Sequence, residues 1–155
     1  MATVQVRYIV NDVAAAIPFY TEQLGFTLVM HPAPPFAMLE RGDLRLVLSA
    51  PNPSAGGGAP MPSGAAQSPG GWNRFAIEIQ DLDATVARLT SSGARFRNAI
   101  VDGVGGRQII VEDPSGNPIE LFQPTIQDAR LGSGHAREPE RGGAAKTELD
   151  WTFEL

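Results

Sequence analysis

Residues 112–122, EDPSGNPIELF, combine a tight turn with the start of an apolar strand. Pro114 and Gly116 occupy the second and fourth positions of a turn that begins at Asp113, which is the pattern of a type I β-turn. The apolar residues after this turn predict a strand over 118–123. Upstream, residues 19–26, FYTEQLGF, are typical of a helix that ends at Gly25 and is followed by a new strand.

The chain contains two copies of one pattern. Residues 10–13 (VNDV) correspond to 79–82 (IQDL) at an offset of 69, and 46–51 (LVLSAP) correspond to 119–124 (IELFQP) at an offset of 73. Each copy predicts a strand, an Asp-capped helix and three further strands. We therefore predict an α+β fold of two tandem βαβββ modules that form a concave cleft. The expected strands lie at 4–10, 26–31, 36–41 and 44–49 in copy one, and at 74–80, 95–100, 107–112 and 118–123 in copy two.

The domain organisation follows from this repeat. Residues 1–124 are expected to form a single domain, with module one at 1–50 and module two at 72–124. The connecting loop, 51–71, is rich in Gly, Pro, Ala and Ser and carries no charge, which is typical of a flexible segment. The tail, 125–155, is predicted to be mostly irregular, with a short edge strand possible at 151–155.

Composition excludes several classes of function. The 155-residue chain has no cysteine and two histidines, so thiol nucleophiles, Cys-ligated zinc and a three-histidine zinc site are excluded. The net charge of −5 argues against a nucleic-acid partner. No apolar run approaches the ~20 residues of a membrane span, and no signal peptide is apparent. We expect no membrane partner and a cytoplasmic location.

Two motifs together carry a family resemblance. The element Asp12-(x)6-Phe19-Tyr20-(x)3-Leu24-Gly25-Phe26, with EDPSGNPIELF at 112–122, resembles the vicinal oxygen chelate superfamily. That superfamily includes glyoxalase I, extradiol dioxygenases, fosfomycin-modifying enzymes and bleomycin-binding resistance proteins. The resemblance covers about residues 2–124. It implies the glyoxalase/bleomycin resistance/dihydroxybiphenyl dioxygenase-like fold, a ligand in the cleft and a homodimer.

The resemblance also implies where a metal would be bound. Metal-binding members place one ligand on the first and one on the last strand of each module. These positions correspond here to Gln5, Val47, Arg74 and Glu120. Val47 has no donor atom, and Arg74 is a permanent cation that repels a divalent ion. We therefore expect no cofactor, and a divalent metal only if the protein is an enzyme with an unusual site.

Strand alternation assigns side chains to the cleft. If Val4, Val6 and Tyr8 lie under the first helix, their neighbours on the strand face the cleft. Glu120 is the candidate catalytic residue, as a general base, or else it forms a structural ion pair with Arg74. Trp72 either stacks on a planar ligand or anchors the loop. The candidate ligand-binding residues are Gln5, Arg7, Arg45, Val47, Trp72, Arg74, Glu78 and Phe122.

The favoured interpretation is a metal-independent binding protein, similar to bleomycin-resistance-type members, that holds an amphiphilic or aromatic small molecule. The alternative is a glyoxalase-like or dioxygenase-like enzyme, a lyase or isomerase that uses Glu120 with or without a divalent metal. In the binding protein, Arg7 and Arg45 either grip an anionic group of the ligand or lie on a solvated rim.

Overall fold

Two β-sheets with the same strand order form the core of the protein. The computed structural model describes residues 4–53, 57–126 and 129–130. Sheet one has the order β1-β4-β3-β2; sheet two has the order β5-β9-β8-β6, and β7 also pairs with β8. The first strand of each module runs parallel to the last strand of that module, as β1 does to β4 and β5 to β9. The predicted α+β fold is confirmed, and both sheets fit the tandem βαβββ repeat.

Module one follows the predicted order closely. Its elements are β1 (Val4–Ile9), α1 (Val13–Pro18), the π-helical turn η1 (Phe19–Gln23), β2 (Thr27–Ala33), β3 (Phe36–Arg41) and β4 (Leu44–Ser49). Asp12 caps α1, since its Oδ1 accepts a hydrogen bond of 3.1 Å from the Ala15 N–H. The α-helix ends at Pro18, which has no N–H to continue the ladder, and the chain widens into η1.

Module two repeats these elements, with a shorter first strand and two short strands in place of one long second strand. They are β5 (Ala76–Glu78), α2 (Leu82–Ser91), β6 (Arg95–Phe96), β7 (Val101–Asp102), β8 (Gly106–Glu112) and β9 (Pro118–Pro124). The single strand predicted at 95–100 is wrong, because β6 and β7 are separate. Between them, the Asn98 side chain accepts the Ile110 N–H at 2.9 Å, so a side chain replaces the backbone ladder at that point.

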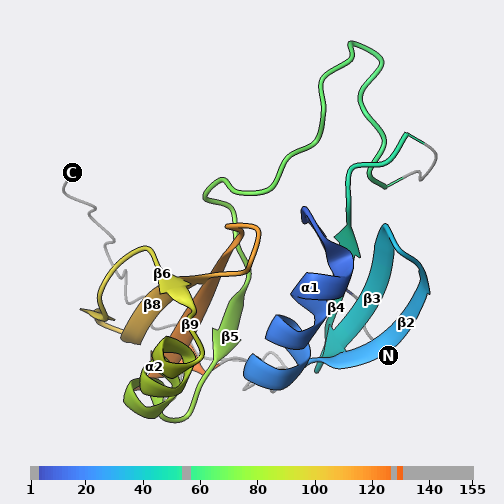
Figure 1. Ribbon diagram of the computed structural model, residues 1–155. Helices are drawn as coiled ribbons and strands as arrows, with labels where there is room; N and C mark the ends of the chain where they lie inside the picture. Colours follow the sequence, from blue (N-terminus) through green and yellow to red (C-terminus); the bar gives the residue numbers. More distant parts are fainter. Residues whose placement is uncertain (1–3, 54–56, 127–128, 131–155) are drawn as a thin grey trace, which may run out of the picture.

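Both helices lie on the same side of the molecule, each against its own sheet (Figure 1). The helix-facing residues form one core that spans both modules, including Tyr20, Leu46, Leu82 and Leu121, all fully buried. The prediction that Val4 lies under the first helix is wrong. Val4 is 57% exposed, whereas Tyr8 on the same strand is buried.

A buried polar cluster, which we call the clasp, joins the modules. Asp113 is buried, and its carboxylate accepts hydrogen bonds from Tyr20 Oη at 2.7 Å and from Asn117 Nδ2 at 2.9 Å. Asn117 Nδ2 also donates to the Ile9 carbonyl at 2.7 Å, and Tyr8 Oη donates to the Pro118 carbonyl at 2.6 Å. The EDPSGNP turn thus holds module two against module one.

Phe75 fills the space between the modules, with its ring centroid 5.1 Å from that of Tyr8 and 6.0 Å from that of Phe26. Among the described residues, no helix is long and apolar enough to cross a bilayer. The possible strand at 151–155 lies outside the described residues.

Candidate functional site

The sheet faces turned away from the helices, here called the helix-free faces, carry the residues that alternation assigns to the cleft. On sheet one, the strand register places Arg7 beside Val47 and Val47 beside Met38, while Arg45 lies between Gln5 and Glu40. The alternate residues Leu46 and Leu48 are in the core. On sheet two, Ala76 pairs with Glu120 and Glu78 with Phe122. The predicted alternation therefore places these side chains on one face of each sheet.

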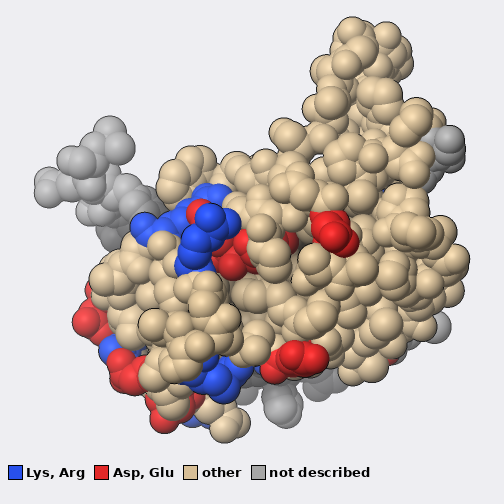
Figure 2. Space-filling view, in the orientation of Figure 1, with Lys and Arg blue, Asp and Glu red and all other residues tan. Residues whose placement is uncertain are grey.

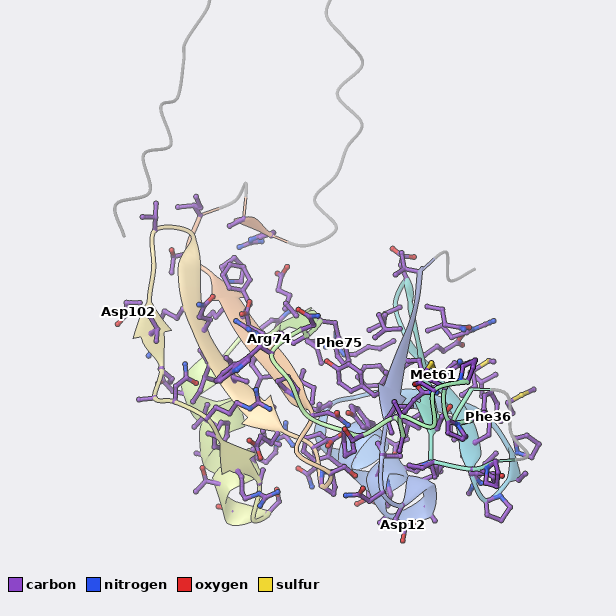
Figure 3. All side chains as sticks on the ribbon, turned by 90° about the horizontal axis from the view of Figure 1, so that it is seen from above. Asp12, Phe36, Met61, Arg74, Phe75 and Asp102 are labelled. Carbon is purple, nitrogen blue, oxygen red and sulfur yellow. The ribbon has the colours of Figure 1, made fainter. Side chains whose placement is uncertain are left out.

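A pocket of about 390 Å³, the seam pocket, lies where the edge strand β1 meets the segment before β5. Figure 3 shows Arg74 and Phe75 in the middle of the molecule, between the two modules. Two arginines that are far apart in the sequence, Arg7 and Arg74, line this pocket together. The remaining lining is mixed, with Val6, Tyr8, Ile9, Ser68, Gly70, Asn73, Phe75 and Asn117. This mixture of apolar walls and a few polar groups is typical of small-molecule sites.

Arg74 and Glu120 form an ion pair. Arg74 Nε and Nη2 lie 3.1 and 2.9 Å from Oε1 of Glu120, and Nη1 donates to the Trp72 carbonyl at 3.1 Å. The Glu120 side chain is 19% exposed, so the pair is partly shielded from water. The resemblance predicts metal ligands at both positions. In this chain the carboxylate is instead neutralised by the guanidinium.

The other two implied metal positions do not supply a site. Val47 is buried at 1% exposure and has no donor atom, and Gln5 is exposed at the start of β1. Within the described ranges, no three His, Cys, Asp or Glu side chains lie close enough together to hold a metal ion. The donor set therefore does not fit a divalent metal, which needs three or four such ligands.

Other candidate residues lie away from the seam pocket. Trp72 is 69% exposed, and the Arg97 guanidinium sits 4.6 Å from its ring centroid. Arg97 also hydrogen-bonds the Gly71 carbonyl, an arrangement expected of a loop anchor.

Glu78 lines a second hollow, about 430 Å³, beside the β3–β4 turn. Phe122 is half-buried, and Gly106 packs so closely on its ring that an added Cβ would lie 2.8 Å from it.

The 51–71 loop forms specific contacts with both modules. Gly57 packs against the Arg7 guanidinium so closely that an added Cβ would lie 2.6 Å from Cζ. Gln67 Nε2 donates to the Gly57 and Ala59 carbonyls at 3.1 and 2.8 Å. At the far end, the Gly70 N–H donates to Asn117 Oδ1 at 2.8 Å. Figure 2 shows that the part between these contacts is an arm without charged side chains.

The clasp also contributes to the site, and the sequence carries no local signal for it. Burial raises the pKa of Tyr8 to about 12, and burial together with the Asp113 carboxylate raises the pKa of Tyr20 well above 10. Tyr8 and Asn117 line the seam pocket while they join the modules. Asn117 belongs to the 112–122 motif, but the sequence does not indicate that both Nδ2 and Oδ1 of its side chain form hydrogen bonds.

A family model described as the Glyoxalase/Bleomycin resistance protein/Dioxygenase superfamily matches residues 3–121. The chain belongs to this superfamily. Within it, the chain is 30% identical over 115 residues to "Putative glyoxylase CFP32" of Mycobacterium bovis, a match that covers 73% of this chain and 42% of CFP32. The chain thus spans less than half the length of this curated relative.

Solved structures of other proteins share this fold. TnmS3, an antibiotic binding protein from Streptomyces sp. CB03234, is 28% identical with a TM-score of 0.61, and the match covers 81% of this chain and 98% of TnmS3. Lactoylglutathione lyase from Agrobacterium tumefaciens is 22% identical with a TM-score of 0.60, covering 79% of this chain and 92% of the lyase. At that identity the lyase shows a common fold alone.

Proposed function

We propose that this protein binds a small amphiphilic or aromatic molecule between its two modules, without a metal ion. The Arg74–Glu120 ion pair carries the proposal. Metal-binding members are expected to place ligands at these two positions, and here a cation occupies one of them and neutralises the other. The likeness to TnmS3, whose name records antibiotic binding, supports binding as the function.

Metal content tests this proposal directly. After dialysis against a weak chelator, we expect less than a tenth of an equivalent of any divalent metal by mass spectrometry. A thermal-shift screen of aromatic natural products, thiol conjugates and divalent metals should give shifts with organic compounds. The control is the triple variant Gln5→His, Val47→Glu, Arg74→His, which we expect to gain metal affinity. Stoichiometric metal retained by the parent contradicts the proposal.

An enzyme that uses Glu120 as a base is the second candidate. One observation favours it: Arg74 occupies Oε1, while Oε2 has no hydrogen-bond partner among the described residues. Glu120→Gln separates the two functions, because the amide oxygen still accepts from Arg74 but the side chain no longer takes up a proton. A binding protein keeps its affinity in this variant. An enzyme keeps substrate affinity and loses turnover by at least a hundredfold.

The proposal includes a homodimer. Sheet one ends in the edge strand β2, where Leu28, Val29 and Met30 are 41–46% exposed. An exposed apolar edge strand favours pairing with another chain. Light scattering of the eluted protein tests this point, and a monomer at micromolar concentration removes the dimer from the proposal without affecting ligand binding.

A further inference from the structure

Two buried polar atoms on β4 have no hydrogen-bond partner among the described residues. They are Arg45 Nε and Ser49 Oγ. Both residues project from the helix-free face of sheet one, on either side of Val47, and Ser49 is only 3% exposed. An unpartnered buried polar atom costs about 1–3 kcal/mol, so such atoms in a folded protein call for an explanation.

Arg7 lies on the same face, one strand away. Its register partner is Val47, which places it diagonally next to Arg45 across adjacent strands about 4.8 Å apart. Neither Arg7 nor Arg45 forms an ion pair with another described residue. Four other arginines do: Arg74 with Glu120, Arg95 and Arg97 with Glu112, and Arg107 with Asp83 and Asp102.

The surroundings of these two arginines suit an organic anion. The carboxylate nearest in register is Glu40, which neighbours Arg45 on β3 but does not pair with it. Apolar residues complete the face, with Ile9 and Phe36 beside Ser49, and Met38 beside Val47. In a chain of net charge −5, two unpaired guanidinium groups next to an apolar surface attract an anion with an apolar body.

We propose that the ligand is an organic acid whose carboxylate or sulfonate is bound by Arg7 and Arg45. Its apolar body lies along Ile9 and extends into the seam pocket, which Arg7 and Ile9 line. The Ser49 hydroxyl donates to a second polar atom of the body. This inference rests on the proposed small-molecule function and specifies the chemical class of the ligand.

Matched probes test the charge requirement. We would measure the affinity of 2-naphthoate and biphenyl-4-carboxylate, and of the corresponding neutral alcohols, by titration calorimetry. A charge-assisted hydrogen bond of ~1.5–3 kcal/mol corresponds to roughly 10–150-fold in affinity. We therefore expect each acid to bind at least tenfold more tightly than its alcohol, and to bind more weakly as salt rises.

Charge-matched variants assign this preference to the two arginines. Arg45→Gln and Arg7→Gln are each expected to weaken acid binding at least tenfold and to leave alcohol binding within twofold. Because Arg7 is exposed, the Arg7→Gln variant is expected to fold even if Arg45→Gln, which changes a half-buried residue, does not. The control is Arg95→Gln, which removes the same charge from a side chain that is 68% exposed, and should change neither affinity.

The outcomes separate the ligand class from the function. Equal affinity for acids and alcohols, or an acid preference that survives Arg7→Gln, overturns the anion site and leaves small-molecule binding standing. If no acid and no alcohol binds, while the screen also gives no thermal shift, both the ligand class and the proposed function are wrong. Acid-selective binding that both arginine variants abolish and Arg95→Gln preserves supports the inference.

Discussion

Removing the carboxylate of the clasp is expected to destabilise the protein strongly. Asp113 accepts four hydrogen bonds, from Tyr20 Oη, Asn117 Nδ2, and the backbone N–H groups of Ser115 and Asn117. In Asp113→Ala, the Tyr20 hydroxyl and one N–H of the Asn117 side-chain amide lose their partner in buried surroundings, while the Asn117 amide keeps its bond to the Ile9 carbonyl. Each buried donor costs about 1–3 kcal/mol, so we expect a loss of ~3–5 kcal/mol in the free energy of unfolding.

Urea denaturation followed by circular dichroism measures this loss. Tyr20→Phe removes one donor and leaves the carboxylate its other three, so it is expected to cost about 1–2 kcal/mol. The double variant Asp113→Ala, Tyr20→Phe has no orphaned Tyr20 hydroxyl. Its loss in the free energy of unfolding should therefore be smaller, by ~1–2 kcal/mol, than the sum of the losses of the two single variants. Asp43→Ala, at an exposed turn, serves as the control and should change stability by less than about 0.5 kcal/mol. A loss below about 1 kcal/mol in Asp113→Ala refutes the clasp.

Three further predictions concern the tyrosines, the loop and the metal. Tyr8 and Tyr20 are the two tyrosines of the chain, and the pKa of each is raised in the folded state. Their contribution to the stability of the folded state is therefore complete below pH 10 and is lost as pH rises toward 12. Absorbance at 295 nm should therefore show no tyrosinate at pH 10.5, and its later rise should coincide with unfolding; early titration contradicts this. Gly58→Ala places a Cβ 2.2 Å from the Ala50 carbonyl oxygen, and should lower stability by ~1–3 kcal/mol, whereas Gly103→Ala should be near neutral. Added zinc should not raise the melting temperature of the parent, and a rise at stoichiometric zinc would show that the Arg74–Glu120 pair opens for metal.

The strand pattern predicted module one well because its signals are local. The strands predicted at 36–41 and 44–49 coincide with β3 and β4, and Asp12 and Asp81 cap the helices as expected. Module two differs from the prediction at 95–100, where a side chain replaces the backbone hydrogen bonds between strands. The Asn98 amide bonds to β8 across 12 positions of sequence, and no local pattern signals such a bond.

The sequence predicts which sheet face each site residue lies on, but not which residues it contacts. Alternation assigned Arg7 and Arg74 to the cleft, yet the seam pocket that both residues line depends on how the modules pack. That packing is set by Asp113 and Asn117, whose bonds reach Tyr20 and Ile9 more than 90 positions away. Trp72, which alternation leaves unassigned, is held by a cation–π contact with Arg97 that the sequence does not indicate.

Ligand binding after metal removal shows whether this protein binds its ligand without a metal ion. The protein would be stripped with EDTA, and the strongest organic compound from the screen titrated in calorimetry with EDTA present and again with added zinc or manganese. We expect one-to-one binding with the same affinity, within twofold, under all three conditions. Binding that is lost in EDTA and restored by either metal would contradict it.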